Sequence, residues 1–162
     1  MALAAGLGGV LGGAIGGLVS DRLAVRDRRW WLWAPALAFF ANIPLVLLLF
    51  NAGSPVMALF LLGAVQFNYH FWGGSGHAMV QSLVGKRMRA MAASMFLLVI
   101  NLVGLGLGPP LVGALSDFTT ATYGEEALRY ALMATTPVFL IAGSLFLSSA
   151  RTLRRDLDAA PA

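Results

Sequence analysis

The sequence predicts an all-α fold, a polytopic membrane helix bundle with five transmembrane helices. Of its 162 residues, 59% are hydrophobic and 11% are charged, whereas soluble domains carry about 25% charged residues. The apolar residues form runs that reach the roughly 20 residues a helix needs to cross a bilayer. Basic residues separate these runs, because ten of the eleven lysines and arginines fall in three clusters: Arg22, Arg26, Arg28 and Arg29; Lys86, Arg87 and Arg89; and Arg151, Arg154 and Arg155.

The apolar runs place the five spans in order along the chain. We expect helices at residues 2–20, 30–50, 55–83, 90–116 and 127–150. Residues 1–150 then form one transmembrane bundle, and residues 151–162 form a basic cytoplasmic tail. Trp30, Trp31 and Trp33 open the second span, where indole rings favour the membrane interface.

Positive charge sets the expected orientation. The connection after the second span is short and neutral, and the one after the fourth has Asp117, Glu125 and Glu126 beside Arg129 alone. Ten basic residues therefore lie on one side of the membrane, and such loops stay in the cytoplasm. The sequence predicts a multi-pass protein of the cell membrane, with its N-terminus outside and its C-terminus in the cytoplasm.

Small residues on two spans predict close helix packing. Glycines recur at a spacing of four in the first span, and lipid-embedded helices use small residues to bring their backbones together. The fourth span has a second glycine group before Pro109 and Pro110, which we expect to bend or break that helix. The packing candidates are Gly8, Gly12, Gly16, Gly104 and Gly108.

The third span carries the candidate substrate pathway. At about 100° per residue, five of its positions fall within one sector of roughly 80°. These positions are Gln66, His70, Gly73, His77 and Gln81. Polar groups at membrane depth usually face a bundle interior or a water-filled route. Asn101 of the fourth span either borders the same route or joins helices.

Two alternatives for the histidines remain open. His70 and His77 either contact the route, where imidazoles can exchange protons near neutral pH, or are neutral and hydrogen-bonded between helices. A shared metal ion is disfavoured, because seven residues of helix separate the two by about 10 Å. No cysteine or carboxylate lies near them in the sequence to complete a metal site.

The loop after the first span carries a family resemblance. Residues 17–29 are GLVSDRLAVRDRR, and a glycine, an Asp-Arg pair four residues later and further basic residues resemble the signature loop of the major facilitator superfamily. The resemblance implies that Gly17, Asp21, Arg22 and Arg26 belong to a conformational latch on the cytoplasmic face. Arg22 and Arg26 are the expected partners of Asp21, whose charge opposes the dipole at a helix C-terminus. Ala24 departs from the family pattern, which usually has glycine there.

Three further stretches resemble the Spinster-like branch of that superfamily, which is linked to lipid and other amphipathic substrates. They are DRRWWLWAPA at residues 27–36, VQSLV leading to RMRA within residues 80–90, and INLVGLGLGP at residues 100–109. The resemblance maps the five spans onto helices eight to twelve of a twelve-helix transporter. The similar endings GLVSD, at residues 17–21, and GALSD, at residues 113–117, fit an inverted repeat whose first helix is missing.

The resemblance implies the C-terminal portion of a secondary active transporter that moves a small or amphipathic solute by alternating access. Its expected partners are the solute, the lipid bilayer and the missing N-terminal helices, in the same chain or in a separate one. The alternative is a non-transporting membrane module that packs through its glycine faces. No enzymatic activity, cofactor, metal site or nucleic-acid partner is expected, because the spans lack a deep carboxylate, a phosphate-binding loop and a continuous basic face.

Overall fold

Helices form all the regular structure of the described residues, 2–159, in the computed structural model. α1 covers Ala2–Ala24, α2 covers Trp30–Phe50, α3 covers Pro55–His70 and α4 covers Gly73–Ser82. A 3-10 turn at Lys86–Met88 leads to α5, Arg89–Ile100, then to a π-helical segment, Asn101–Leu107, and to α6, Gly108–Tyr123. A second 3-10 turn at Gly124–Glu126 leads to α7, Ala127–Ala134, and α8, Pro137–Asp158.

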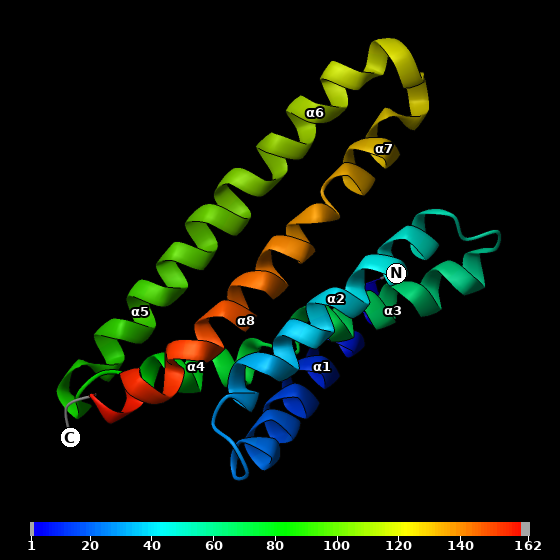
Figure 1. Cartoon of the computed structure of the whole chain (residues 1–162). Helices are drawn as coiled ribbons and strands as arrows, with labels where there is room; N and C mark the ends of the chain where they lie inside the picture. Colours follow the sequence, from blue (N-terminus) through cyan, green and yellow to red (C-terminus); the bar gives the residue numbers. More distant parts are fainter. Residues whose placement is uncertain (1, 160–162) are drawn as a thin grey trace.

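The predicted fold class is confirmed. The described residues form an all-helical bundle (Figure 1), and three helical runs among them are long and apolar enough to cross a membrane: Ala2–Ala24, Trp30–Phe50 and Lys86–Leu153. The last run is 68 residues long and contains two antiparallel arms. The chain reverses between these arms at Gly124, whose φ of 55° glycine adopts without the steric cost that a Cβ atom brings.

The third and fifth expected spans are each two helices rather than one, since α7 and α8 share the fifth. α3 ends at His70 and α4 begins at Gly73, so Phe71 and Trp72 form a turn between them. The Phe71 amide donates to the Asn68 carbonyl oxygen at 3.3 Å, which is one residue nearer than the partner in an α-helix. Glycines at the first two positions of α4 favour this interruption, because glycine weakens a helix interior.

The expected bend or break at Pro109 and Pro110 is wrong. The chain stays helical from Arg89 to Tyr123, and Figure 1 draws α5 and α6 as one extended rod. The two prolines fall in the first turn of α6, where amide hydrogens need no partner within the helix. The π-helical segment directly before them accommodates the change in hydrogen bonding.

Three helix ends lie beyond their expected positions. α1 continues past the expected end at residue 20 to Ala24, α6 continues past residue 116 to Tyr123, and α8 continues past residue 150 to Asp158. Most of the expected basic tail is therefore the last part of a helix, and residues 160–162 of that tail lie outside the described residues.

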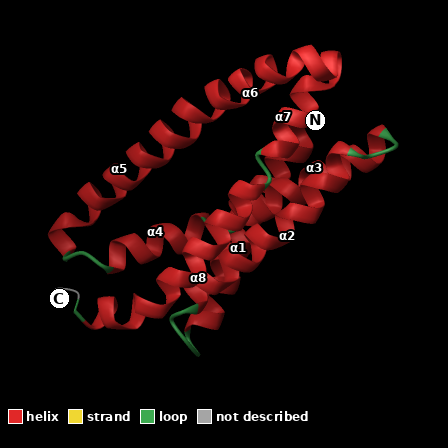
Figure 2. Cartoon of the chain, turned by 45° about the horizontal axis from the view of Figure 1, so that its top comes forward, coloured by secondary structure: helices red, strands yellow, loops and turns green. Residues whose placement is uncertain are grey.

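The pair formed by α2 and α8 carries the core. α2 packs against α8 and α3, and α1 packs against α3, while the rod of α5 and α6 stands apart from α1, α2 and α3 (Figure 2). Leu32 of α2 is buried with Ala150 and Leu153 of α8. Further along, the ring of Phe39 lies 6.3 Å from that of Phe139 and 5.4 Å from that of Phe146, between centroids.

Glycines bring α1 against the backbone of α3. A Cβ atom added at Gly12 would lie 2.8 Å from the Cα of Phe67, and one at Gly16 would lie 2.8 Å from the Cα of the turn residue Phe71. Those distances are shorter than the van der Waals contact of about 3.5–4.0 Å between carbon atoms. Alanine at either position would therefore force the helices apart.

The remaining packing candidates fall into two groups. Gly8 faces the backbone of Gly63 on α3, where an added Cβ would lie 3.1 Å from the Gly63 carbonyl carbon. Nothing lies within 4 Å of a Cβ added at Gly104 or Gly108. A packing role for these last two stays a prediction.

Candidate functional site

The predicted pathway residues Gln66, His70, Gly73, His77 and Gln81 form the polar stripe of the third span. The first half of this stripe faces α1. Gln66 and His70 of α3 line a hollow of about 420 Å³ together with residues of α1: Ala5, Gly6, Gly9 and Val10. The Nδ1 atom of His70 lies 3.0 Å from the Gln66 carbonyl oxygen. The imidazole occupies the space beside Gly9, where an added Cβ would lie 3.2 Å from the ring. This hollow presents an exposed imidazole between two tightly packed helices.

The second half of the stripe has aromatic surroundings. The His77 ring stacks on that of Trp72, with centroids 6.4 Å apart and an interplanar angle of 11°, and its centroid lies 5.2 Å from that of Phe96 on α5. Its Nδ1 atom lies 2.7 Å from the Gly73 carbonyl oxygen. Gln81 follows one turn further along α4 and is half-buried. The two histidines therefore have different neighbours.

The side chain of Asn101 is bonded within its own helix. It begins the π-helical segment of the rod that stands apart in Figure 1. Its exposed side-chain amide donates to the Leu97 carbonyl oxygen of the same helix at 2.8 Å. Within the described part of the chain, no three His, Asp or Glu side chains gather closely enough to hold a metal ion.

An aromatic cavity beside the turn between α3 and α4 has no counterpart in the sequence-based prediction. Its volume is about 360 Å³, and residues of α2, α3, α4, α5 and α8 line it together with the turn itself. The aromatic lining residues are Phe39, Tyr69, Trp72, Phe96, Phe139 and Phe146. They come from four of the predicted spans, so no periodicity within one span brings them together.

Asp21 is bonded to a tryptophan rather than to an arginine. The indole Nε1 of Trp31 donates to the Asp21 carboxylate at 3.0 Å, whereas Arg22 and Arg26 were the expected partners. The difference follows from the longer α1, since Asp21 and Arg22 lie in its last turn and neighbouring helical positions point about 100° apart. Arg22 and Arg26 are both exposed.

Further contacts shape the loop around this hydrogen bond. The backbone amide of Arg29 donates to the Asp27 carboxylate at 3.0 Å, directly before the first turn of α2. A hollow of about 440 Å³ connects the loop to the end of α4, because Ser82 lines it together with Asp21 and Trp31. The loop residues therefore touch the ends of three helices.

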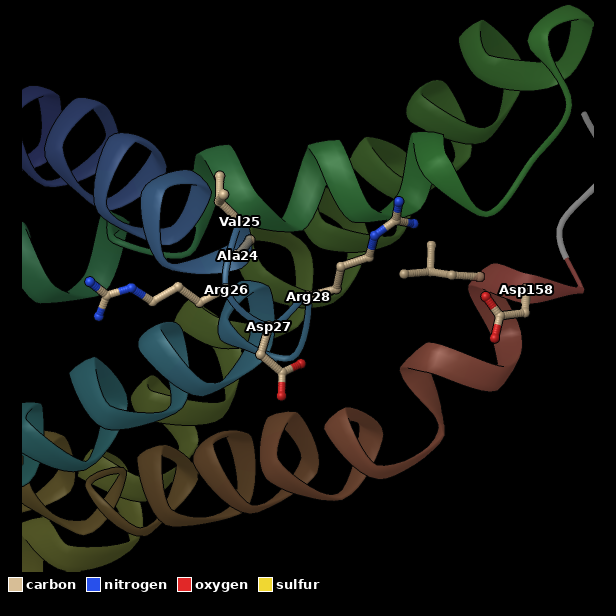
Figure 3. A pocket seen from close by; sticks show the side chains of 7 residues that line it. Ala24, Val25, Arg26, Asp27, Arg28 and Asp158 are labelled. Carbon is tan, nitrogen blue, oxygen red and sulfur yellow. The ribbon is translucent and has the colours of Figure 1, made fainter.

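A second hollow of the loop opens toward the end of α8. Arg26, Asp27, Arg28 and Asp158 are among its lining residues, and its volume is about 420 Å³. In Figure 3 the Arg28 side chain extends toward the end of α8, whereas Arg26 points the opposite way. The loop after α1 and the end of α8 therefore line one hollow.

Comparison with known proteins finds similarity to a membrane pump. It is 36% identical over 157 residues to an "MFS-type efflux pump" of Mycolicibacterium smegmatis, whose name refers to the major facilitator superfamily. This chain is similar to one part of that pump. The similarity covers 96% of the chain, which spans 36% of the length of this curated relative. No family model matches the sequence.

The similarity to this pump agrees with the broader sequence-based predictions. The apolar helices of this chain suit a membrane protein, as does its similarity to a pump. The loop at residues 17–29 resembles the signature loop of the superfamily that the relative's name gives.

Proposed function

We propose that the chain is one part of a secondary transporter that exports a small or amphipathic solute by alternating access. The 36% identity to an efflux pump over 96% of the chain carries this proposal. The hollow at Gln66 and His70 supports it, because polar groups at membrane depth are costly and are usually retained along a solute or ion route.

Alternating access needs helices that move together and joints between them. We assign α1 and α3 to one rigid unit, since their glycine contacts leave no space for the helices to approach further. The turn at Phe71 and Trp72 is the joint, because it interrupts the hydrogen bonding between α3 and α4. The hydrogen bond between Trp31 and Asp21 acts as the latch that holds the ends of α1 and α2 together in one state.

The proposal includes an orientation and a partner. The protein lies in the cell membrane with its N-terminus outside and its basic clusters and C-terminus in the cytoplasm, following the distribution of positive charge. Its partner is the rest of the transporter, in the same polypeptide or in a second chain. The chain spans 36% of its relative's length, and the rod of α5 and α6 has exposed glycines that suit contact with further helices.

The proposed solute class rests on the resemblance to the Spinster-like branch. Residues 27–36, 80–90 and 100–109 resemble the Spinster-like branch, so we propose a lipid-like or otherwise amphipathic solute.

A chimera tests the proposal. The segment of the Mycolicibacterium smegmatis pump that aligns with this chain is replaced by the chain, and the chimera is expressed in cells that lack the pump. Ethidium is the fluorescent probe, and the native pump sets the reference rate of export. Restored export supports the proposed function, whereas a chimera that reaches the membrane at the native level without any export contradicts it.

A further inference from the structure

The aromatic cavity is built by residues that fix one another's positions. Trp72 lies at the turn between α3 and α4, and Gly76 allows its ring to lie against α4, because an added Cβ would be 2.9 Å from Trp72 Cε3. Phe96 of α5 meets the Trp72 ring at 87° with centroids 6.1 Å apart. Phe39 of α2 packs on Phe139 of α8. Rings from α2, α5, α8 and the turn before α4 therefore line one space.

The chemistry of the lining selects a class of ligand. None of the residues that line the cavity carries a charge, and its polar side-chain groups are the hydroxyl of Tyr69 and the indole N–H of Trp72. A charged ligand would lose its hydration there without gaining a partner. Aromatic rings instead favour offset-stacked and edge-to-face contacts with another ring. The volume of about 360 Å³ lies within the range of about 300–1,000 Å³ that is typical of small-molecule sites.

Exposed apolar side chains flank the cavity on α8. Val138 lines it and is 59% exposed, and its neighbour Ile141 is likewise 59% exposed on the outer surface of α8. Both residues lie in the first turns of an apolar helix, far from the basic end of α8. With this surface of α8 in the bilayer, a molecule dissolved in the acyl chains would reach the cavity past apolar side chains.

We propose that this cavity binds a neutral, planar aromatic molecule that enters from the hydrocarbon phase of the bilayer. The site is distinct from the hollow at Gln66 and His70, and the proposal does not depend on transport by the chain. The joint at Trp72 forms part of its wall, so an occupant would contact both α4 and α5.

Energy transfer from Trp72 to a bound probe tests this proposal. The chain has four tryptophans, so a variant with Trp30, Trp31 and Trp33 changed to Phe leaves Trp72 as the single donor. The probe is N-phenyl-1-naphthylamine, a neutral aromatic compound, added to vesicles that contain the protein. We expect transfer that saturates with probe concentration. A signal that rises linearly, as partition into lipid alone would produce, overturns the proposal.

Matched variants and ligands locate the site and its chemistry. Ala142→Phe fills the cavity and is expected to weaken binding by about tenfold or more, whereas Ile141→Phe on the adjacent outer position leaves it unchanged. Ala142→Leu provides a milder filling if the Phe variant does not fold, and the probe's own emission repeats the titration in the chain with all its tryptophans. Equal binding to the Ala142 and Ile141 variants overturns the assignment of the site.

Two competitors test the ligand class. 8-Anilino-1-naphthalenesulfonate has a similar ring system with an added negative charge, and we expect no saturable transfer to it because no cation lines the cavity. Naphthalene is expected to displace the bound probe, and hexadecane is not. Displacement by hexadecane at equal potency would make the cavity an acyl-chain site and would overturn the proposed preference for aromatic molecules.

Discussion

The indole of Trp31 and the carboxylate of Asp21 form a 3.0 Å hydrogen bond between the first turn of α2 and the last turn of α1. A carboxylate at the C-terminal end of a helix is unfavourable beside the negative end of the helix dipole. The indole N–H offsets this cost and ties two membrane helices together next to a loop with four arginines.

Removing the indole donor is expected to loosen this connection. Trp31→Phe should lower the free energy of unfolding in detergent by about 1 kcal/mol, the usual contribution of one hydrogen bond. Asp21→Ala should cost a similar amount, and the double variant should cost little more than either single one. Trp30→Phe is the control, and additive losses in the double variant would mean that the two side chains are not coupled.

Two adjacent glycines test the contact between α1 and α3. Gly12→Ala would place a Cβ atom 2.8 Å from the Cα of Phe67, whereas the nearest atom to a Cβ at Gly13 is 3.8 Å away. Gly12→Ala should therefore destabilise the protein by about 1–3 kcal/mol. Gly13→Ala should be neutral or stabilising by up to about 1 kcal/mol, because alanine is the better helix former. Chemical unfolding monitored by circular dichroism separates the two, and equal stabilities would refute the close contact.

Thiol labelling can test the proposed orientation. The chain contains no cysteine, so each introduced cysteine is the single site of labelling. We expect a membrane-impermeant maleimide to label Gly53→Cys in intact cells and to label Val25→Cys only after permeabilisation. Both positions suit the purpose, since nothing lies within 4 Å of a Cβ at Gly53 and Val25 is 88% exposed. The reverse pattern would place the basic clusters outside and contradict the orientation.

The two histidines are expected to respond differently to substitution in the chimera. His70→Gln should slow export by about fivefold or more, because the imidazole lines the open hollow beside α1. His77→Phe should leave export close to the unsubstituted rate, since its ring mainly packs on Trp72 and Phe96. Initial rates of ethidium export measure both. Unchanged export by the His70 variant would assign that residue to packing.

The sequence predicted the bounds of helices correctly where the local signals for helix starts and ends were strong. The bounds of α2 agree with the expected 30–50, because a basic loop with interfacial tryptophans precedes it and a short polar turn follows it. Ser54 and Pro55 mark the start of α3, where the Ser54 hydroxyl accepts a hydrogen bond from the Met57 amide at 3.3 Å. The interruption after His70 was missed, although Gly73 and Gly74 were its available signal.

Features that depend on contacts between helices were harder to predict from the sequence. The periodicity of the third span placed His70 and His77 on one face, but the turn at Phe71 and Trp72 gave them different neighbours. The partner of Asp21 was assigned by distance along the chain, and the fold supplied Trp31 instead. The aromatic cavity combines rings from several helices, so only the packing of those helices defines it.

The export rate of the chimera beside that of the chain alone is the most direct test of the central claim, that this chain is one part of a transporter. Both proteins are expressed at equal membrane levels in Mycolicibacterium smegmatis cells that lack the native pump, and ethidium export is followed by fluorescence. We expect the chimera to restore export and the chain alone to leave it at the level of the empty vector. Export by the chain alone, or none by a chimera present in the membrane, would contradict the claim.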